Sequence, residues 1–335
     1  MAGALTPLGT NVVTSIARRY IMPTIVDNVY GSNPIFFRIN KSKRLIKGGH
    51  RIEVPLMHAR FTNGGAYEGL DVLNITPSDT VKNGAWDWRQ YYVSVAVDGR
   101  TLIKVDSPEA IANFLRLQFQ QAEMEMAANL GQAIWGTNTS GAGKEIDGLG
   151  LAVDASLPYA GLDPASNIWW ASTEYTTGTA LSLDALNRNL WSPASEGGRH
   201  PSIIVSRQDG YDGYYQLAVG TGSTPRQQIF QGPQAYDEQL FAGGFTNLLF
   251  NGVPWVADPN VPDSNVGSGT LNTDVFMLNE DYIHWCISPR GDMFVTDFQE
   301  GLTQDAMAAK ILWAGNLVVT NRARQAKATG LNVPA

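Results

Sequence analysis

The chain has 335 residues, of which 44% are hydrophobic and 16% are charged, and its formal net charge is −7. The hydrophobic share is ample for a large core, so the composition excludes a wholly disordered chain, and the length predicts two lobes or one elaborated domain. The single cysteine, Cys286, excludes an internal disulfide framework and is consistent with a reducing compartment. No signal peptide and no run of about 18 apolar residues is evident, so no membrane span is expected.

The charges are distributed unevenly along the chain. Residues 1–60 hold nine Lys or Arg residues against Asp27 and Glu53, a balance of +7, so the remainder carries −14. A basic arm on an acidic body favours either nucleic acid or another copy of the chain as a partner. Low charge together with nine tryptophans and twelve tyrosines favours surface buried between subunits, although carbohydrate-binding proteins have a similar composition.

Residues 1–40 are expected to form an arm, with a short helix over 11–20 and a turn at Ser32–Pro34. Strands over 51–57 and 86–97 then bracket about 25 residues, which predicts a long hairpin. A two-stranded hairpin is marginal in water unless something packs on it, so its length points to a partner surface.

The second strand of this hairpin alternates regularly. The alternation places Trp86, Trp88 and Tyr92 on one face, opposite the valines. A turn at Asp98-Gly99 is expected to lead into a further strand over 101–105.

The longest regular segment is a helix predicted from Ser107 to about Trp135. Ser107 suits the N-cap, and Pro108 suits the first helical position. The helical period places seven apolar residues on one stripe: Ile111, Leu115, Phe119, Ala122, Met126, Leu130 and Ala133. A thinner second stripe contains Leu117, Met124 and Trp135, so the helix is expected to pack on two sides.

The second half of the chain alternates shorter helices and strands. A helix is predicted to begin at Ser182, and another covers 211–219. The predicted strands cover 203–205, 245–250, 252–257, 274–278, 282–287, 293–298 and 311–320, the last with a turn at Gly315-Asn316.

No motif in the sequence supports catalysis, a metal site or a cofactor. The glycines before Lys144 lack the first glycine and the Ser/Thr of a phosphate-binding loop. The four histidines have no metal-ligand spacing, and residues 209–213 lack a calcium-loop pattern. Asp87 points away from its flanking tryptophans in a strand, which disfavours a sugar-cleaving site.

The order of these parts resembles the major capsid protein of tailed bacteriophages, the Hong Kong 97 fold. Several stretches are similar to sequence patterns of that family, and the resemblance rests on the order in which these stretches occur. They are Ile25–Pro34, Lys47–Leu56, Tyr67–Asp71, Asp147–Leu149, Trp169 and Phe250–Asp258.

The resemblance implies an α+β capsid fold with five parts. Residues 1–40 would be an N-terminal arm, and 41–105 an extended β-hairpin loop with flanking strands. Residues 106–160 would form a peripheral domain with the long spine helix, and 161–281 an axial domain. Residues 282–335 would return strands to the peripheral domain and end in a tail.

The function implied is a shell subunit without catalysis, which assembles into pentamers and hexamers around double-stranded DNA in a virion made in the host cytoplasm. Implied partners are the chain itself, a scaffolding protein, a portal and a decoration protein. The expected intersubunit residues are Arg18, Arg19, Lys41, Lys43, Arg44, Trp86, Trp88 and Tyr92. Lys82 and Asn83 lack the complete residue set of the family's cross-link, so none is expected. An encapsulin-like compartment and, less favoured, a carbohydrate-active or carbohydrate-binding protein remain the alternatives.

Overall fold

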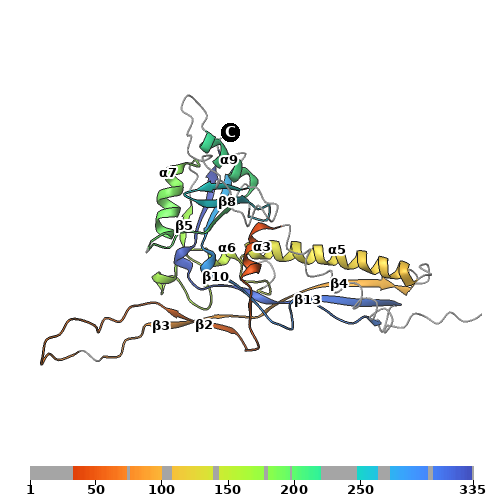
Figure 1. The fold of residues 1–335 in the computed structure, drawn as a ribbon, viewed down its shortest axis with the longest axis horizontal. Helices are drawn as coiled ribbons and strands as arrows, with labels where there is room; N and C mark the ends of the chain where they lie inside the picture. Colours follow the sequence, from red (N-terminus) through yellow and green to blue (C-terminus); the bar gives the residue numbers. More distant parts are fainter. Residues whose placement is uncertain are drawn as a thin grey trace, which may run out of the picture.

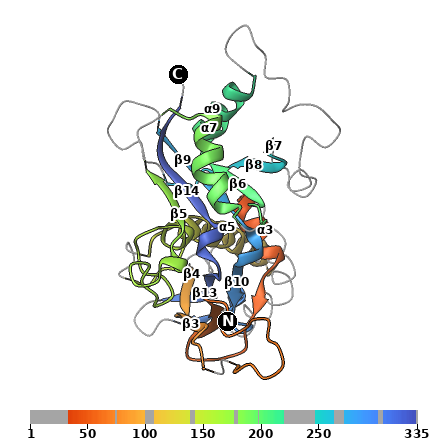
Figure 2. The same cartoon turned by 90° about the vertical axis from the view of Figure 1, so that its left-hand side faces the viewer.

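The computed structural model describes residues 33–73, 76–99, 108–138, 143–176, 180–196, 198–219, 247–262, 272–300 and 305–333. These residues form two lobes and a hairpin that projects from the first lobe (Figures 1 and 2). The predicted helix over 11–20, the strand over 101–105 and the cap at Ser107 lie outside the described residues.

The first lobe is a long helix, α5 (Pro108–Trp135), packed along a six-stranded sheet. All seven residues of the predicted stripe are buried. The second stripe is wrong as a packed face, because Leu117 and Met124 are exposed and only Trp135 is buried. The strands of this sheet are β1 (Arg44–Leu45), β4 (Arg89–Asp98), β10 (Ile283–Ile287), β11 (Phe294–Val295), β12 (Gln299–Glu300) and β13 (Ala306–Val319).

The second lobe is built on another six-stranded sheet in the order β5-β14-β9-β6-β8-β7. Its strands are β5 (Thr173–Thr176), β6 (Ile203–Ser206), β7 (Asn247–Phe250), β8 (Val253–Ala257), β9 (Asn272–Leu278) and β14 (Ala326–Asn332). One face packs against α9 (Gln208–Val219) and the helical segment of α7 (Leu183–Ala185), η2 (Leu186–Trp191) and α8 (Ser192–Ala194). The other face joins the first lobe's core, where the rings of Trp135 and Phe276 lie 4.9 Å apart.

The helix predicted at Ser182 is confirmed. The Ser182 side chain accepts a hydrogen bond from the Ala185 N–H at 3.2 Å, which satisfies one of the unpaired donors of the first turn. The remaining short helices are α6 (Leu149–Ala152), η1 (Ile168–Trp170), η3 (Glu280–Tyr282) and η4 (Arg322–Arg324).

Of the turn predicted at Ser32–Pro34, Ser32 lies outside the described residues, and Pro34 instead begins a helix, α3 (Pro34–Lys41). Asn33 caps it by accepting a hydrogen bond from the Phe36 N–H at 3.2 Å. Phe36 is buried and meets Trp285 edge-on at 5.5 Å between ring centroids. The end of the predicted arm is therefore part of the chain's own core.

The strand predicted over 86–97 is two strands in two sheets. β3 (Val81–Trp86) pairs with β2 (Ile52–Met57) in the hairpin, and β4 pairs with β13 after a break at Asp87-Trp88. The alternation changes phase at the break, because the even-numbered Trp86 is buried on β3, whereas on β4 the odd-numbered Val95 and Val97 are buried and Tyr92 is exposed.

The turn predicted at Gly315-Asn316 is also wrong, because β13 continues through it to Val319. A Cβ on Gly315 would lie 2.5 Å from the Cys286 carbonyl oxygen, so the glycine permits a close approach of two strands.

The strand predicted over 293–298 is shorter in the structure, where only β11 forms, and β12 follows it. β14 was not predicted, and it places the end of the segment 282–335 in the second sheet.

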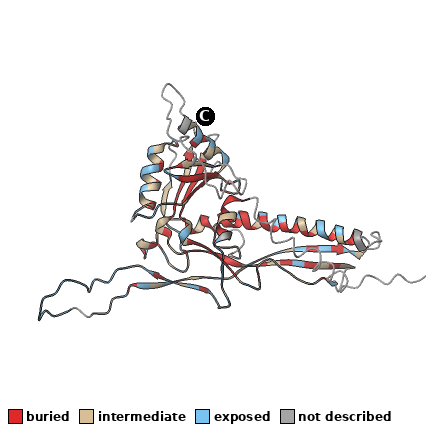
Figure 3. Cartoon of the chain, viewed as in Figure 1, coloured by how far each residue is buried: buried red, intermediate tan, exposed pale blue. Residues whose placement is uncertain are grey.

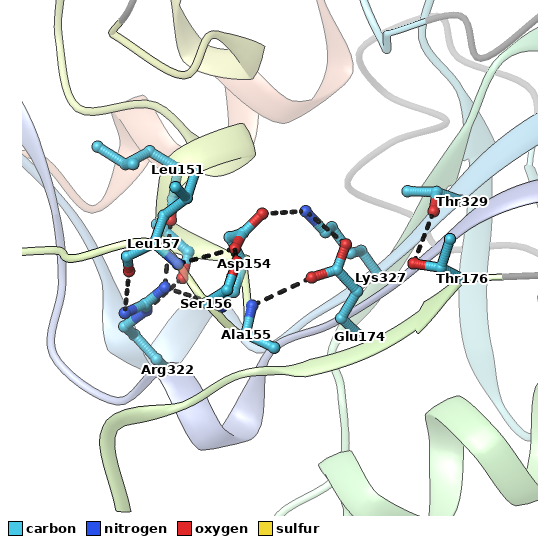
Figure 4. A network of polar contacts seen from close by, with 11 residues as sticks. Leu151, Asp154, Ala155, Ser156, Leu157, Glu174, Thr176, Arg322, Lys327 and Thr329 are labelled. Atoms are coloured by element: carbon cyan, nitrogen blue, oxygen red, sulfur yellow. Dashed lines mark hydrogen bonds and ion pairs between the residues drawn. The ribbon is translucent and has the colours of Figure 1, made fainter. Parts of the chain in front are cut away.

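The link from β13 to β14 is held by a buried polar network (Figure 4). Arg322 is fully buried and donates hydrogen bonds to four carbonyl oxygens, those of Leu151, Ala152, Asp154 and Leu157. Lys327 Nζ lies 2.8 Å from the Asp154 carboxylate and 3.1 Å from the Glu174 carboxylate.

This network perturbs the pKa of Asp154. Burial alone would raise the pKa of its carboxyl, but hydrogen bonds from Lys327, Ser156 and Leu157 outweigh burial and lower the pKa to about 2. A carboxyl whose pKa is depressed by folding stabilises the fold above its unfolded pKa, near 4, and loses that contribution as the pH falls through about 2.

We therefore predict that Asp154→Asn lowers the unfolding midpoint at pH 7 and weakens the loss of stability between pH 4 and pH 2. Thermal unfolding of the unassembled chain across this pH range is the measurement. Asp184→Asn is the control, because its ion pair with Arg188 is exposed and should contribute at most about 0.5 kcal/mol. Superimposable pH profiles for wild type and Asp154→Asn would contradict the prediction.

Candidate interaction surfaces

The β2–β3 hairpin is fixed to the first lobe at its base. Trp86 is 1% exposed and meets the ring of Tyr159 edge-on at 5.8 Å between centroids. The Ala85 N–H donates to the Ala160 carbonyl at 3.0 Å, and Lys82 Nζ donates to Asn167 Oδ1 at 2.7 Å. These contacts all lie within one chain, so the direction in which the hairpin leaves the lobe is set before any partner binds.

The rest of the hairpin extends away from both lobes and is mostly exposed (Figure 3). Its large apolar side chains are exposed as well: Met57, Phe61, Tyr67, Leu70, Val72, Leu73 and Val81. Leu70 and Val72 are fully exposed, at 101% and 99%. A concentration of uncovered apolar side chains on a projecting element is typical of a surface that binds another protein.

A tight turn at Glu68–Asp71 shapes the hairpin tip. The Glu68 N–H donates to Asp71 Oδ2 at 2.9 Å, and the Asp71 N–H donates to the Glu68 carbonyl at 3.2 Å. Gly69 has φ +52°, a left-handed conformation that glycine adopts without cost. The turn therefore projects the fully exposed Leu70, two residues after the acidic Glu68.

A second uncovered surface lies on the face of the β4–β13 sheet that points away from α5. Tyr92 is opposite Leu312 on β13, and Leu312 is opposite Phe294 on β11, so the three side chains form a row across three strands. Tyr92 is 68% exposed and Phe294 is 48% exposed. A groove of about 370 Å³ runs beside this row and is bordered by the exposed cations Arg290 and Lys310.

The three aromatic residues predicted as contacts do not share one surface. Trp86 is enclosed within its own chain and has almost no surface left for a neighbour. Trp88 is half-buried at the break between β3 and β4, where its Nε1 donates to the Gly49 carbonyl at 3.0 Å. Tyr92 alone lines the groove on the outer face.

The predicted basic contacts are also separated. Lys43 forms an ion pair with Asp292 at 2.7 Å, and Arg44 lies exposed on β1 at the edge of the first sheet. Arg18 and Arg19 lie outside the described residues, as does the side chain of Lys41.

The buried titratable groups near Arg44 do not indicate a reactive site. Burial, and then the charge of Arg44, lower the pKa of His284 to about 4, so this imidazole is neutral at pH 7. Burial raises the pKa of the Cys286 thiol to about 11, although Arg44 acts in the opposite direction. A thiol that stays protonated at neutral pH is a poor nucleophile and a poor metal ligand.

Within the described residues, no three His, Cys, Asp or Glu side chains gather in a group that could hold a metal ion. His58 lies against Trp169 at 5.5 Å between ring centroids, and His200 stacks on Trp191 at 5.4 Å.

None of the helices in the described part of the chain is long and apolar enough to cross a membrane.

No protein-family model matches the sequence, and no curated protein matches it. Among solved structures, the chain is similar to the capsid of cyanophage A-1(L), with 14% identity, a TM-score of 0.64, and coverage of 91% of this chain and 94% of that chain. The capsid of the native GTA particle has 12% identity, a TM-score of 0.57 and coverage of 88% and 89%. The SrpI encapsulin of Synechococcus elongatus has 12% identity, a TM-score of 0.56 and coverage of 93% and 90%.

These similarities extend over nearly the whole chain, and they confirm the α+β Hong Kong 97 fold that the sequence resemblance implied. The identities are too low to carry function from one protein to the next. Within the described part of this fold, the projecting hairpin and the outer face of the first sheet both leave large apolar side chains uncovered.

The burial of Trp86 and the partial exposure of Trp88 predict losses of stability of different size for two nearby substitutions. Trp86→Ala should destabilise the unassembled chain by about 3–5 kcal/mol, because it removes a large side chain from a packed core. Trp88→Ala is the matched control and should cost much less. Chemical unfolding of both variants tests this, and equal losses of stability would show that Trp86 does not anchor the hairpin.

Proposed function

We propose that the chain is a major capsid protein of a tailed phage, which self-assembles into pentamers and hexamers and then into an icosahedral head around double-stranded DNA. The proposal includes no catalytic role. The observation that carries it is the combination of this fold with a fixed hairpin whose tip exposes apolar side chains.

The driving force in this proposal is burial of the hairpin's apolar surface on neighbouring copies. Each buried square ångström of apolar surface contributes about 25 cal/mol before the costs of association, and many equivalent contacts add up in a closed shell. The acidic body suits a lining that should not bind packaged DNA tightly. A scaffolding protein, a portal and a decoration protein are the further proposed partners, with assembly in the host cytoplasm.

An encapsulin-like compartment is the second candidate, because the SrpI encapsulin has a similar fold over 93% of this chain. The two candidates differ in content, since a phage head holds DNA and a compartment holds a protein cargo. A carbohydrate-binding protein would instead stay a small oligomer, and sugar would quench its tryptophan fluorescence.

Negative-stain electron microscopy and sedimentation of the concentrated protein test self-assembly. Closed shells, or rings of five and six subunits, are expected, if necessary after addition of a scaffolding protein or at low pH. Nuclease-protected DNA in particles isolated from infected cells would distinguish a phage head from a compartment. A chain that remains monomeric under all of these conditions would overturn the proposal.

We predict that replacing residues 59–79 by Asn-Gly abolishes shells and leaves a folded, soluble chain. His58 N donates to the Thr80 carbonyl at 2.9 Å, so these residues can flank a two-residue hairpin turn, and the base that contains Trp86 is retained. Electron microscopy measures shells, and circular dichroism measures folding. If this variant formed shells in wild-type yield, residues 59–79 of the hairpin would not be needed for assembly.

A further inference from the structure

We propose that a pocket between the base of the hairpin and the link from β13 to β14 is a binding site for a small aromatic carboxylate. The carboxylate would lie against Arg324 and His58, and the aromatic ring would lie against Trp169 and Tyr282. The pocket is formed by a single chain, so this inference does not depend on the proposed self-assembly.

The pocket has a volume of about 340 Å³, which is within the range of small-molecule sites. Its walls come from β2 at the base of the hairpin, from η1 and η3, and from the segment at η4 that links β13 to β14. These segments are far apart in the sequence and meet only in the folded chain. A ligand that binds here would therefore bind the folded chain and not the unfolded chain.

Two nitrogen groups of the pocket have no partner within the described part of the chain. The Arg324 guanidinium forms no ion pair there, and Nδ1 of His58 is buried without a hydrogen-bond partner. A buried polar atom without a partner costs free energy, and a guanidinium stays charged at neutral pH. A carboxylate would satisfy the planar fork of the guanidinium, and it would accept a hydrogen bond from His58 in the tautomer that carries its proton on Nδ1.

The described residues that line the pocket include no Asp or Glu. No carboxylate of the chain therefore competes for the Arg324 guanidinium inside the pocket. This charge pattern favours an anionic ligand over a neutral or cationic one.

The aromatic wall of the pocket is held in place by contacts within the chain. The ring of Trp169 lies 5.5 Å from that of His58 and 5.4 Å from that of Trp170, measured between centroids. Trp170 is buried, and its Nε1 donates to the Tyr159 carbonyl at 3.1 Å. Trp169 and Tyr282 are each only half-buried, so their rings keep surface that a flat ligand can cover. Because the wall is already ordered, binding costs little side-chain entropy.

An occupied pocket would connect the hairpin to the link between the sheets. Val54, Leu56 and His58 belong to the hairpin side of the pocket, whereas Arg324 follows Arg322, which anchors the link. A ligand that contacts both sides stabilises the base of the hairpin, because it is lost when the two sides separate.

Isothermal titration calorimetry of the full chain with 2-naphthoate tests the site. Arg324→Gln should weaken binding by about tenfold or more, because it removes charge-assisted hydrogen bonds to the carboxylate. Arg290→Gln is the matched control, because this exposed cation borders the groove beside Tyr92 instead, and it should leave the affinity unchanged. A wild-type chain that does not bind 2-naphthoate, or equal affinities of the two variants, would overturn the proposal.

Two analogues separate the contribution of the charge from that of the ring. 2-Naphthalenemethanol lacks the carboxylate, and cyclohexanecarboxylate lacks the aromatic ring, so each should bind about tenfold more weakly than 2-naphthoate or worse. The affinity for 2-naphthoate should also fall as the salt concentration rises. Equal binding of all three compounds would overturn the proposed ligand class.

Hydrogen exchange of the wild-type chain locates the ligand without a substitution, so the test stands even if a variant fails to fold. Saturating 2-naphthoate should slow exchange in β2 and η4 but not in α9, which contributes nothing to the pocket. Equal protection of all three segments, or protection of α9 alone, would place the ligand elsewhere and overturn the proposal.

Discussion

The arrangement of the two lobes depends on one buried cation. Arg322 lies where the chain leaves β13 in the first sheet and turns towards β14 in the second. Removing a guanidinium from water is costly unless its donors are satisfied, and here four carbonyl oxygens of residues 151–157 satisfy them. The geometry is restrictive, because the guanidinium donors are fixed in a plane and the carbonyls belong to one short segment. These hydrogen bonds therefore fix the position of the link between β13 and β14 relative to residues 151–157.

The same cation is connected to the base of the hairpin through aromatic rings. The Arg322 guanidinium lies 5.4 Å from the ring centroid of Tyr159, and the Tyr159 ring also meets Trp86 edge-on. The Tyr159 hydroxyl donates to the Leu317 carbonyl at 3.1 Å and accepts from the Val319 N–H at 3.0 Å. Tyr159 thus contacts β13, the crossover and the hairpin at once, and the direction of the hairpin follows from the packing that joins the lobes.

The elements that could be predicted from the sequence are those with a long hydrophobic pattern among residues that are close together in the chain. The helix over 108–135 has a regular stripe and no proline after its first residue, and all seven residues of the predicted main stripe are buried, together with Glu123, Ala127 and Ile134, which were not predicted. The missed features depend on distant contacts instead. β14 contains Lys327, whose burial is possible only because Asp154 and Glu174 pair with it. At Gly315, β13 passes so close to Cys286 that a Cβ would lie 2.5 Å from the Cys286 carbonyl oxygen.

The outer groove could not be predicted for the same reason. Its row combines residues 92, 294 and 312, which become neighbours only through the pairing of β4 and β11 with β13. Tyr92 was predicted as an intersubunit contact from strand alternation alone, and the alternation within β4 is observed. The tryptophans before it belong to a different sheet or to the break between sheets, so a single face shared by all three does not exist.

The hairpin is held at its base by contacts within one chain and is uncovered at its tip. Different residues of the hairpin therefore contribute to folding and to association. The buried contacts of Trp86 stabilise a single chain, whereas Leu70 and Val72 contribute to stability only when another surface covers them. In the closed shell that we propose, each copy would both supply a tip and cover one, so every exposed patch would be buried without an unpaired end. An open arrangement would leave its last tip uncovered, and this difference favours closure.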